Sequence, residues 1–356
     1  MRSIVVVLED ITKMGGIQKV VSVVFSELSK NVNNKITIIS LTKTEDSPFF
    51  ELHSNVIVTY LFSDGIKVRN NYKMVSKAIN KCSVVINADM VVVAGMGFLP
   101  LLDMKKYGHK CIAWEHGNYY QGHALGHAWR GRHLADRYAR RIVVLTERDR
   151  EQYLQRMANK EKVVRIGNPI KVSGKTSKTM VSNKILSAGR LSKIKGFDVL
   201  LEIASIIKGK SISFEWHIYG KGEEYNRLKR VINEKGLNKH VFIHDRVDHL
   251  EDVMKDYGVF ALTSRKESFG MVLLEAINEG MPVISFDCKF GPGEIIKNGQ
   301  NGYLVKEGDK QGFAEKLIEM INDVNSETMA NRQDTIIEYD LKKIVEKWDN
   351  LINEIG

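Results

Sequence analysis

Short runs of branched apolar residues alternate with amphipathic segments of helix length along the whole chain. In the first half these runs cover residues 4–8, 36–41, 91–94, 111–114 and 142–145. In the second half they cover residues 184–188, 214–219, 241–243, 259–262 and 283–286. Strands buried on both faces read as continuous apolar runs, and helices connect parallel strands. The pattern therefore predicts an α/β protein with two doubly wound, Rossmann-like domains that face one another across a cleft at their strand ends.

A polar segment without periodicity separates the two halves. It covers residues 167–179 and is interpreted as the interdomain linker. A chain of 356 residues is long for one core, so two domains are expected. We predict domains at residues 1–170 and 171–335, followed by a helix over residues 336–356 that carries Trp348.

The sequence favours a cytoplasmic protein. No apolar stretch reaches the roughly 18 residues that a membrane-spanning helix needs. The N-terminal apolar run is too short for a signal peptide and ends in Glu9 and Asp10. The three cysteines, Cys82, Cys111 and Cys288, form no Cys-x-x-Cys pair, which favours free thiols in a reducing compartment.

The net charge of +10 belongs to the first half of the chain. Residues 1–170 contain 25 Lys and Arg against 15 Asp and Glu, whereas residues 171–356 contain 28 of each class. One group of cations has i, i+4 spacing and predicts a stripe along one helix: Arg69, Lys73, Lys77 and Lys81. A second group consists of Arg130, Arg132, Arg137, Arg140 and Arg141.

Two interpretations of this charge stay open. The cations can form a solvated helix face, or they can attract an anionic membrane surface with about 1 kcal/mol for each charge near it. A nucleic-acid partner is not expected, because no basic motif is interleaved with aromatic residues and no known nucleic-acid module is present.

Two glutamates eight positions apart stand out in the second half, within the segment SRKESFGMVLLEAINEGM at residues 264–281. Glu267 follows a predicted strand, and Glu275 lies in the helix that starts near Gly270. The backbone N–H groups of Phe269, Gly270 and Met271 at that helix start suit a phosphate or a sugar hydroxyl. The carboxylates can accept hydrogen bonds from ring hydroxyls, so this layout predicts a nucleotide-sugar site.

Further residues after predicted strands suit the same ligand. Gly15 and Gly16 precede a predicted helix and let backbone approach a phosphate or a sugar, without forming Gly-x-Gly-x-x-Gly. Arg190 and Lys195 follow the strand at 184–188, where cations can stabilise a diphosphate leaving group. A plain loop turn and ordinary surface cations are the alternative interpretations.

The ordered set of motifs resembles the retaining glycosyltransferases of family four, which have the GT-B fold. The resemblance covers nearly the whole chain and rests on the two glutamates and five further motifs: residues 14–17 (MGGI), 188–191 (AGRL), 195–197 (KGF), 290–296 (FGPGEII) and 301–305 (NGYLV). It implies an acceptor-binding N-terminal domain, a nucleotide-sugar-binding C-terminal domain, and a last helix that crosses back to the N-terminal domain.

The resemblance also implies roles for single residues. Glu275 would bind the ribose, Glu267 would lie beside the transferred sugar, and Arg190 with Lys195 would hold the diphosphate. His116 would face the donor sugar, where it could orient the donor or stabilise charge. The base is expected near Gly220 and Val247, and Glu115 is a further candidate for the acceptor pocket.

A metal ion is not expected. His123 and His127 have the i, i+4 spacing that can chelate zinc, but neither a clear third ligand nor an Asp-x-Asp motif is present. Arg190, Lys195 and a helix start can neutralise the diphosphate instead. We therefore expect no cofactor besides the nucleotide diphosphate sugar, which is the donor substrate.

The residues predict a hexosyltransferase that uses a nucleotide sugar, and the family resemblance implies that it retains the anomeric configuration. It would move a hexose or N-acetylhexosamine from a nucleotide diphosphate, UDP being favoured, to a glycan acceptor that can be lipid-linked, at the inner face of the cytoplasmic membrane. Two alternatives remain, a nucleotide-sugar epimerase of similar architecture and an inactive nucleotide-sugar-binding scaffold. The two-glutamate motif argues against the epimerase, and the intact Arg190, Lys195, Glu267 and Glu275 argue against the scaffold.

Overall fold

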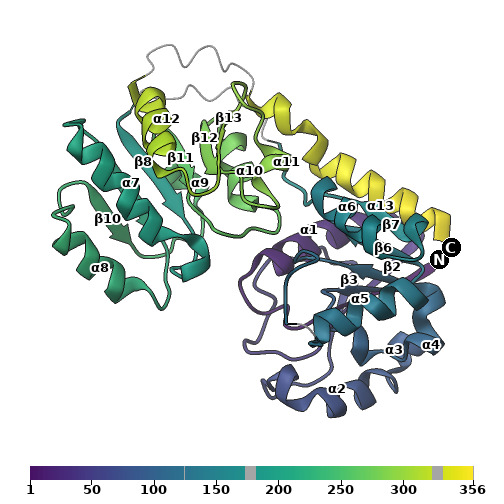
Figure 1. Cartoon of the computed structure of the whole chain (residues 1–356). Coiled ribbons are helices and arrows are strands. Elements are labelled where there is room, and N and C mark those ends of the chain that lie inside the picture. Colours follow the sequence, from purple (N-terminus) through teal and green to yellow (C-terminus); the bar gives the residue numbers. More distant parts are fainter. Residues whose placement is uncertain (124, 173–181, 323–331, 356) are drawn as a thin grey trace. The chain divides into compact units, whose positions relative to one another are not determined.

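The computed structural model describes residues 1–123, 125–172, 182–322 and 332–355, and its contacts divide the chain into two compact units (Figure 1). Unit 1 contains Met1–Pro169 and Leu341–Gly356, and unit 2 contains Ile170–Asp340. The predicted border at residue 170 lies next to this division, whereas the last segment joins unit 1 five residues later than predicted. Residues 173–179 of the predicted linker lie outside the described residues.

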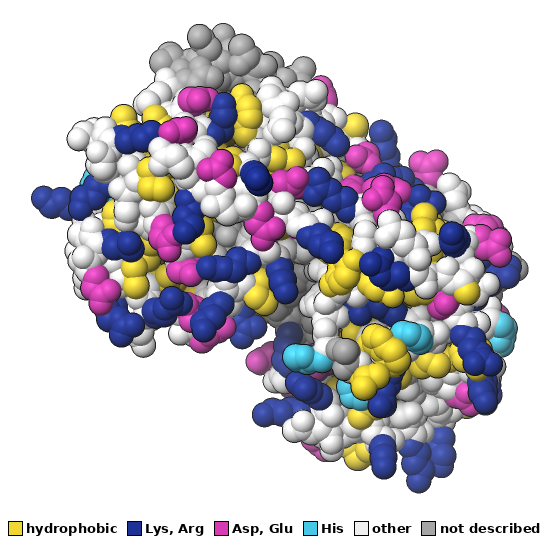
Figure 2. Space-filling model, viewed as in Figure 1, with side chains coloured by type: hydrophobic (Ala, Val, Ile, Leu, Met, Phe, Trp, Pro, Cys, Tyr) yellow, Lys and Arg dark blue, Asp and Glu magenta, His cyan; other side chains and the backbone are white. Residues whose placement is uncertain are grey.

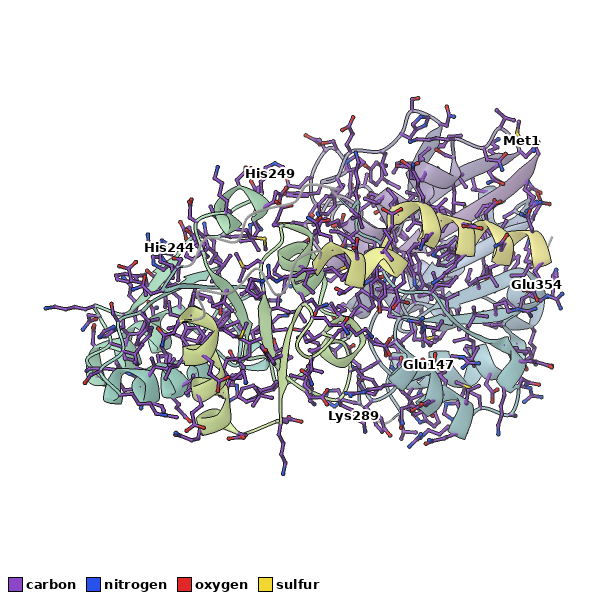
Figure 3. The ribbon with its side chains drawn as sticks, turned by 90° about the horizontal axis from the view of Figure 1, so that it is seen from above. Met1, Glu147, His244, His249, Lys289 and Glu354 are labelled. Carbon is purple, nitrogen blue, oxygen red and sulfur yellow. The ribbon has the colours of Figure 1, made fainter. Side chains whose placement is uncertain are left out.

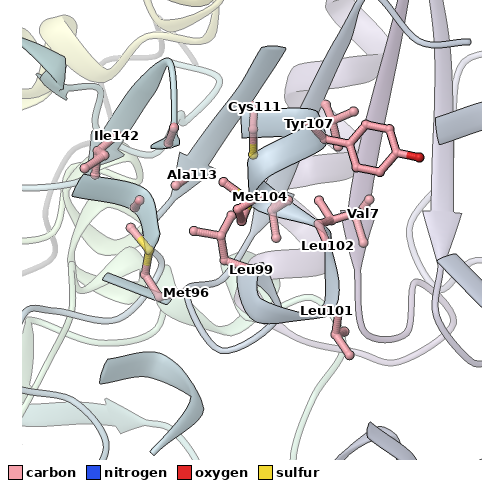
Figure 4. Packing of buried hydrophobic residues seen from close by; sticks show 14 of the residues in the cluster. Val7, Met96, Leu99, Leu101, Leu102, Met104, Tyr107, Cys111, Ala113 and Ile142 are labelled. Atoms are coloured by element: carbon pink, nitrogen blue, oxygen red, sulfur yellow. The ribbon is translucent and has the colours of Figure 1, made fainter. Parts of the chain in front are cut away.

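Unit 1 is built on a parallel sheet of seven strands in the order β3-β2-β1-β4-β5-β6-β7. Their bounds are β1 Arg2–Leu8, β2 Asn34–Ser40, β3 Val56–Tyr60, β4 Met90–Ala94, β5 Cys111–Trp114, β6 Arg141–Val144 and β7 Val163–Arg165. Strands β4 and β5 are fully buried, and β1 is buried from Ile4 to Leu8, as their apolar runs require. Helices cover the sheet, and Figure 4 shows part of the resulting core, where the segment 96–104 packs beside β5 and β6.

The helices of unit 1 include the C-terminal segment of the chain. Their bounds are α1 Gly16–Leu28, α2 Tyr72–Ile79, α3 Ser83–Ile86, α4 Met104–Tyr107, α5 His127–Tyr138, α6 Glu147–Arg156 and α13 Leu341–Ile355. Helix α13 contacts α1, and its buried Trp348 packs against Phe25 of α1 and Trp114 of β5 at ring-centroid distances of 5.8 and 4.6 Å. The last helix therefore completes the core of unit 1, although unit 2 precedes it in sequence.

Unit 2 repeats the architecture with six parallel strands in the order β10-β9-β8-β11-β12-β13. The strands are β8 Lys184–Ala188, β9 Glu215–Tyr219, β10 Val241–His244, β11 Val259–Leu262, β12 Val283–Phe286 and β13 Gly302–Val305. The helices are α7 Phe197–Gly209, α8 Tyr225–Glu234, α9 Glu251–Met254, α10 Met271–Asn278, α11 Pro292–Ile295 and α12 Lys310–Asn322. His244, which ends β10, is labelled in Figure 3.

Strand order reverses beside the first strand of each unit, between β1 and β4 in unit 1 and between β8 and β11 in unit 2. In doubly wound sheets ligands bind at the carboxyl ends of the strands at such a switch point. The loops that follow β8 and β11 are those that carry Lys195 and Glu267. The fold therefore positions the predicted donor residues where a ligand site is expected.

The predicted basic stripe along one helix is wrong. Helix α2 contains Lys73 and Lys77, but Arg69 lies in the preceding 3-10 turn η1, Val68–Asn71, and Lys81 lies beyond the helix end. At the end of the helix, the C-cap residue Asn80 donates its side-chain amide to the backbone oxygen of Leu101 at 2.8 Å. The four cations are nonetheless exposed, and Figure 2 shows Lys and Arg side chains projecting from the part of unit 1 that carries α2.

The second basic group is also divided by the structure. Arg132 is buried and pairs with Glu115, and Arg141 pairs with Glu354 of α13. Arg130, Arg137 and Arg140 remain exposed. Among the described residues, no helix combines the length and the apolar character that crossing a bilayer requires.

Candidate active site

The centre of the site in unit 2 is an ion pair between two predicted donor residues. Nζ of Lys195 lies 2.6 Å from Oε1 of Glu267, and the two side chains are 25% and 10% exposed. The residues are 72 positions apart in sequence and come together because β8 and β11 are neighbours in the sheet. A partly buried cation and a carboxylate thus lie side by side at the switch point.

Backbone contacts fix the two loops against each other. The N–H of Arg265 donates to the backbone oxygen of Ile194 at 2.8 Å, and Thr263 Oγ1 donates to that of Gly196 at 3.1 Å. Gly196 has a left-handed φ of 67°, and a Cβ there would lie 2.0 Å from the backbone oxygen of Thr263. Only glycine fits this approach, so Gly196 determines how closely Lys195 can come to Glu267.

An Arg–Asp clamp adds to this connection. The Arg265 guanidinium donates to both carboxylate oxygens of Asp198 at 2.7 Å, and also to the backbone oxygen of Lys193 at 2.8 Å. This hydrogen bonding lowers the pKa of Asp198 below its usual value. The clamp was not predicted from the sequence, although Arg265 lies two residues before Glu267; nothing local in the sequence indicates its partner 67 positions away.

The start of α10 follows the same loop. Gly270 is its N-cap residue, has a φ of 98° and supplies no side-chain cap to the first N–H groups of the helix. Phe269 is buried and packs edge-on against Tyr339, which anchors the turn, while Met271 is half-buried. Glu275 is half-buried one turn further along α10. An uncapped helix start beside a cation suits an anionic ligand.

Arg190 lies apart from this ion pair. Its side chain is 78% exposed, and its Nε lies 3.8 Å from a carboxylate oxygen of Glu223 in the loop after β9. The structure therefore does not bring Arg190 into contact with Glu267. Its role at the diphosphate stays a prediction.

The expected base site consists of tightly packed loop backbone. The N–H of Gly220 donates to the backbone oxygen of His244 at 3.1 Å, and a Cβ at Gly220 would lie 1.9 Å from the backbone oxygen of Gly189. Val247 is half-buried in the loop that follows β10. These residues share the carboxyl-end edge of β8, β9 and β10 with Lys195.

In unit 1 the two predicted glycines start α1. Gly15 is the N-cap residue with extended backbone, and a Cβ at Gly16 would meet no atom within 4 Å. The space beside Gly16 is therefore open within the described residues, so packing alone does not require glycine there. The preceding loop is held by the buried Asp10, which accepts hydrogen bonds from Thr12 and Thr44.

His116 follows β5 with its ring against that of Trp114 at a centroid distance of 4.1 Å. Burial lowers the pKa of His116 to about 3, and its Nε2 is buried with no hydrogen-bond partner among the described residues. The imidazole is therefore neutral near pH 7, and it can take part in a hydrogen bond but does not supply a positive charge. Of the two roles expected for His116, this favours orienting the donor.

Glu115 cannot serve as an acceptor-binding residue, contrary to expectation. Its carboxylate is 4% exposed and accepts hydrogen bonds from Arg132, Tyr153 and the N–H of Gly117. Both oxygens are thereby engaged inside unit 1. Glu115 is a buried structural carboxylate.

The spacing of His123 and His127 does not place them on one helix. Helix α5 begins at His127, whose ring stacks on Tyr72 at a centroid distance of 3.9 Å, and His123 precedes the helix. In the described part of the chain, no three His, Cys, Asp or Glu side chains gather in a way that could hold a metal ion.

Two doubly wound units with polar loops at the carboxyl ends of their strands define an α/β protein of the GT-B type. The family described as glycosyl transferases group 1 matches residues 171–338, nearly all of unit 2. The amylovoran biosynthesis glycosyltransferase AmsD of Erwinia amylovora is 26% identical over 99% of this chain and 100% of its own length. Unit 2 therefore resembles this glycosyltransferase family, and the likeness to AmsD extends over the whole chain.

Two further comparisons agree with this. The poly(ribitol-phosphate) alpha-N-acetylglucosaminyltransferase of Staphylococcus aureus is 28% identical over 60% of this chain, which spans only 43% of that protein's length. The solved structure of Anabaena HepE in complex with UDP and glucose has a TM-score of 0.80 and 16% identity, and covers 99% of this chain and 100% of its own. The fold predicted from the sequence is confirmed, and the relatives from Erwinia and Staphylococcus are glycosyltransferases.

Proposed function

We propose that this protein is a glycosyltransferase that moves a hexose or N-acetylhexosamine from a UDP-sugar to a lipid-linked glycan in the synthesis of a surface polysaccharide. The observation that carries the proposal is the Lys195–Glu267 pair at the switch point of unit 2. The names of the relatives support it, because they include a polysaccharide-building enzyme, an N-acetylglucosaminyltransferase and a protein solved with UDP and glucose. The matched family consists of transferases, which does not favour an epimerase.

Each donor group has a counterpart in unit 2. Lys195 and Arg190 would meet the diphosphate, the N–H groups of Phe269, Gly270 and Met271 would meet phosphate or sugar oxygens, and Glu275 would bind the ribose. The base would lie near Gly220 and Val247. As the bond to the sugar breaks, charge grows on the leaving UDP, so a fixed cation contributes most in the transition state.

We propose retention of the anomeric configuration by reaction on one face of the sugar. The bond between C1 and the phosphate oxygen breaks, and the acceptor oxygen forms its bond to C1 on the same face. The acceptor hydroxyl transfers its proton to an oxygen of the leaving phosphate. The Glu267 carboxylate accepts a hydrogen bond from the Lys195 ammonium, and a sugar hydroxyl would replace this donor when the sugar binds.

The cellular site is proposed to be the cytoplasmic face of the membrane. Exposed Lys73 and Lys77 of α2, with Arg69 and Lys81 beside the helix, would attract anionic lipids. This attraction would hold the enzyme beside a lipid-linked acceptor without a membrane span.

A donor screen tests the proposal. The purified protein is incubated with UDP-glucose, UDP-galactose and their N-acetylhexosamine analogues, with and without an undecaprenyl-diphosphate glycan, and UDP release and product mass are measured. Transfer by the wild type supports the proposal if proton NMR shows that the sugar has the same anomeric configuration, axial or equatorial, in the product as in the donor. Sugar isomerisation without acceptor would establish the epimerase, and UDP binding without turnover of any donor would establish the scaffold.

The Lys195→Ala variant shows whether turnover depends on the ion pair, and Lys193→Ala is its matched control. Lys193 lies in the same 3-10 turn, but its side chain is exposed. Transfer should fall in the first variant and not in the second.

A further inference from the structure

The loop at residues 116–121, which carries His116, is held by a buried group of charged side chains. Glu115 Oε1 accepts the N–H of Gly117 at 3.0 Å, and Oε2 accepts from Tyr153 Oη at 2.8 Å and Arg132 Nε at 3.1 Å. Arg132 then reaches the far end of the loop, where its Nη2 donates to the backbone oxygens of Asn118 and Gln121 at 2.8 and 3.0 Å. Glu115 thus holds the start of the loop directly and its later residues through Arg132.

Asp149 holds the middle of the same loop. It lies in the first turn of α6, which begins at Glu147 (Figure 3), and its Oδ1 accepts the N–H of Tyr119 at 2.8 Å. Asp149 is 2% exposed, and its Oδ2 is buried without a hydrogen-bond partner among the described residues. A buried carboxylate oxygen without a donor destabilises the ionised form.

The charges that face Asp149 do not offset this penalty. Burial is the largest influence and the negative charge of Glu115 acts in the same direction, whereas Arg132 and the N–H of Tyr119 oppose them; together they raise the pKa of Asp149 to about 7. Arg132 already pairs with Glu115. When Asp149 is ionised as well, Arg132 is the one cation that faces two carboxylates among the described residues of this cluster.

His116 and Tyr153 do not change charge near neutral pH. Burial lowers the pKa of His116 to about 3 and raises that of Tyr153 well above its usual value. Protonation of Asp149 removes one of the two anions without removing Oδ1, the acceptor of the Tyr119 N–H. The hydrogen bond from the Tyr119 N–H favours the ionised carboxylate, but the burial of Asp149 outweighs it. Ionisation of the buried carboxylate therefore costs free energy, and opening of the loop relieves this cost by hydrating Oδ2.

We propose that Asp149 is a positioning residue whose protonation state controls the order of the loop 116–121. Above neutral pH the ionised carboxylate would loosen the loop, and His116 would be placed less firmly toward the donor sugar. The link to donor use rests on the proposed function, whereas the effect on the loop does not.

Hydrogen–deuterium exchange of the peptide that covers residues 116–121 tests the proposal without any substrate. After correction for the intrinsic exchange rate, protection in the wild type should fall about tenfold between pH 6 and pH 8.5, because ionisation is nearly complete 1.5 units above the pKa. In Asp149→Asn, which keeps the acceptor oxygen but cannot ionise, protection should stay constant. An equal fall in Asp149→Asn, or constant protection in the wild type, overturns the proposal.

Asp136→Asn is the matched control. The Asp136 carboxylate also accepts loop N–H groups, those of Ala158 and Asn159 at 3.2 Å, but it does not contact the loop 116–121. In the Asp136→Asn variant, the protection of residues 116–121 should still fall between pH 6 and pH 8.5 as in the wild type. If Asp149→Asn does not fold, carboxyl-carbon NMR of wild-type protein labelled at aspartate decides instead: the proposal requires an aspartate that titrates near pH 7, and its absence refutes it.

A kinetic readout separates positioning from a purely structural role. For a donor that the screen identifies, the wild-type KM should rise severalfold from pH 7 to pH 8.5 while kcat changes less, and Asp149→Asn should abolish the rise. A lack of turnover with every donor would refute the proposed function and leave the exchange experiment valid. A KM that rises equally in both proteins would refute the role in donor positioning.

Discussion

Nζ of Lys195 and Oε1 of Glu267 lie 2.6 Å apart, so two groups expected to contact different parts of the donor contact one another. The pair sits at the end of two neighbouring strands and is reinforced by hydrogen bonds between their loops. A bound diphosphate would compete with Glu267 for the Lys195 ammonium, and the sugar hydroxyls would replace the ammonium at the carboxylate. Donor binding would thus separate Lys195 from Glu267 and give each of them a partner on the donor.

Removing the cation should affect turnover more than binding. In Lys195→Ala, kcat is expected to fall about 10²-fold or more with a smaller change in KM, because the leaving group gains charge in the transition state. Arg190→Ala should follow the same pattern more weakly, since that side chain is largely exposed. Glu275→Ala should instead raise the donor KM through the lost ribose contact. Steady-state kinetics distinguish these cases, and unchanged kcat in both cation variants would reject the assignment.

The fold could be predicted because its signal is repeated along the chain. Apolar runs such as residues 91–94 and 259–262 are buried strands, and parallel strands with covering helices follow from their alternation. The end of α2 could not be predicted: its C-cap residue Asn80 is hydrogen-bonded to the backbone of Leu101 and Asp103, more than 20 positions away, and nothing local in the sequence indicates these partners. The i, i+4 spacing of the lysines continues past that end and carries no information about it.

The site was predicted residue by residue, but its contacts were not. Lys195 and Glu267 were each expected beside the donor, whereas their ion pair depends on strand order, which spacing does not encode. Glu115 was expected in the acceptor pocket, whereas it is buried and hydrogen-bonded by Arg132 and Tyr153, which lie 17 and 38 positions away. The Thr146-x-x-Asp149 spacing marks a helix start, but not the hydrogen bond to Tyr119.

Gly196→Ala should destabilise unit 2. The left-handed φ of 67° disfavours any Cβ by about 1–2 kcal/mol, and the 2.0 Å approach to Thr263 adds steric strain. Urea denaturation followed by tryptophan fluorescence should show a lower midpoint. Gly209→Ala, at the last residue of helix α7 with no atom near the new Cβ, is the control and should not lower stability. Equal midpoints for Gly196→Ala and the wild type would contradict the packing argument.

Transfer activity should survive EDTA. The proposed diphosphate site has Lys195, Arg190 and the start of α10, which together can neutralise the ligand without a divalent cation. The measurement is UDP release before and after dialysis against the chelator, using the donor found in the screen. Loss of activity that Mn²⁺ or Zn²⁺ restores would show that a metal takes part.

The wild type should bind anionic bilayers weakly and reversibly. Arg69, Lys73, Lys77 and Lys81 are exposed around α2, and a few such charges at about 1 kcal/mol each suffice for loose attachment. In flotation with phosphatidylglycerol liposomes, the protein should float at low salt and be released near 1 M salt, where the screening length shortens to about 3 Å. No flotation of the wild type at low salt would remove the membrane proposal.

Charge reversal decides whether these four residues, rather than net charge alone, provide the attachment. A variant with all four changed to Glu should no longer float. The control changes an equal number of exposed cations of unit 2 to Glu, namely Lys229, Arg230, Lys235 and Lys239, and so alters the net charge equally. Because the proposed contact lies on unit 1, this control should still float at low salt. Equal loss in both variants would mean that total charge governs binding, and equal flotation of the first variant and the wild type would exclude the α2 surface.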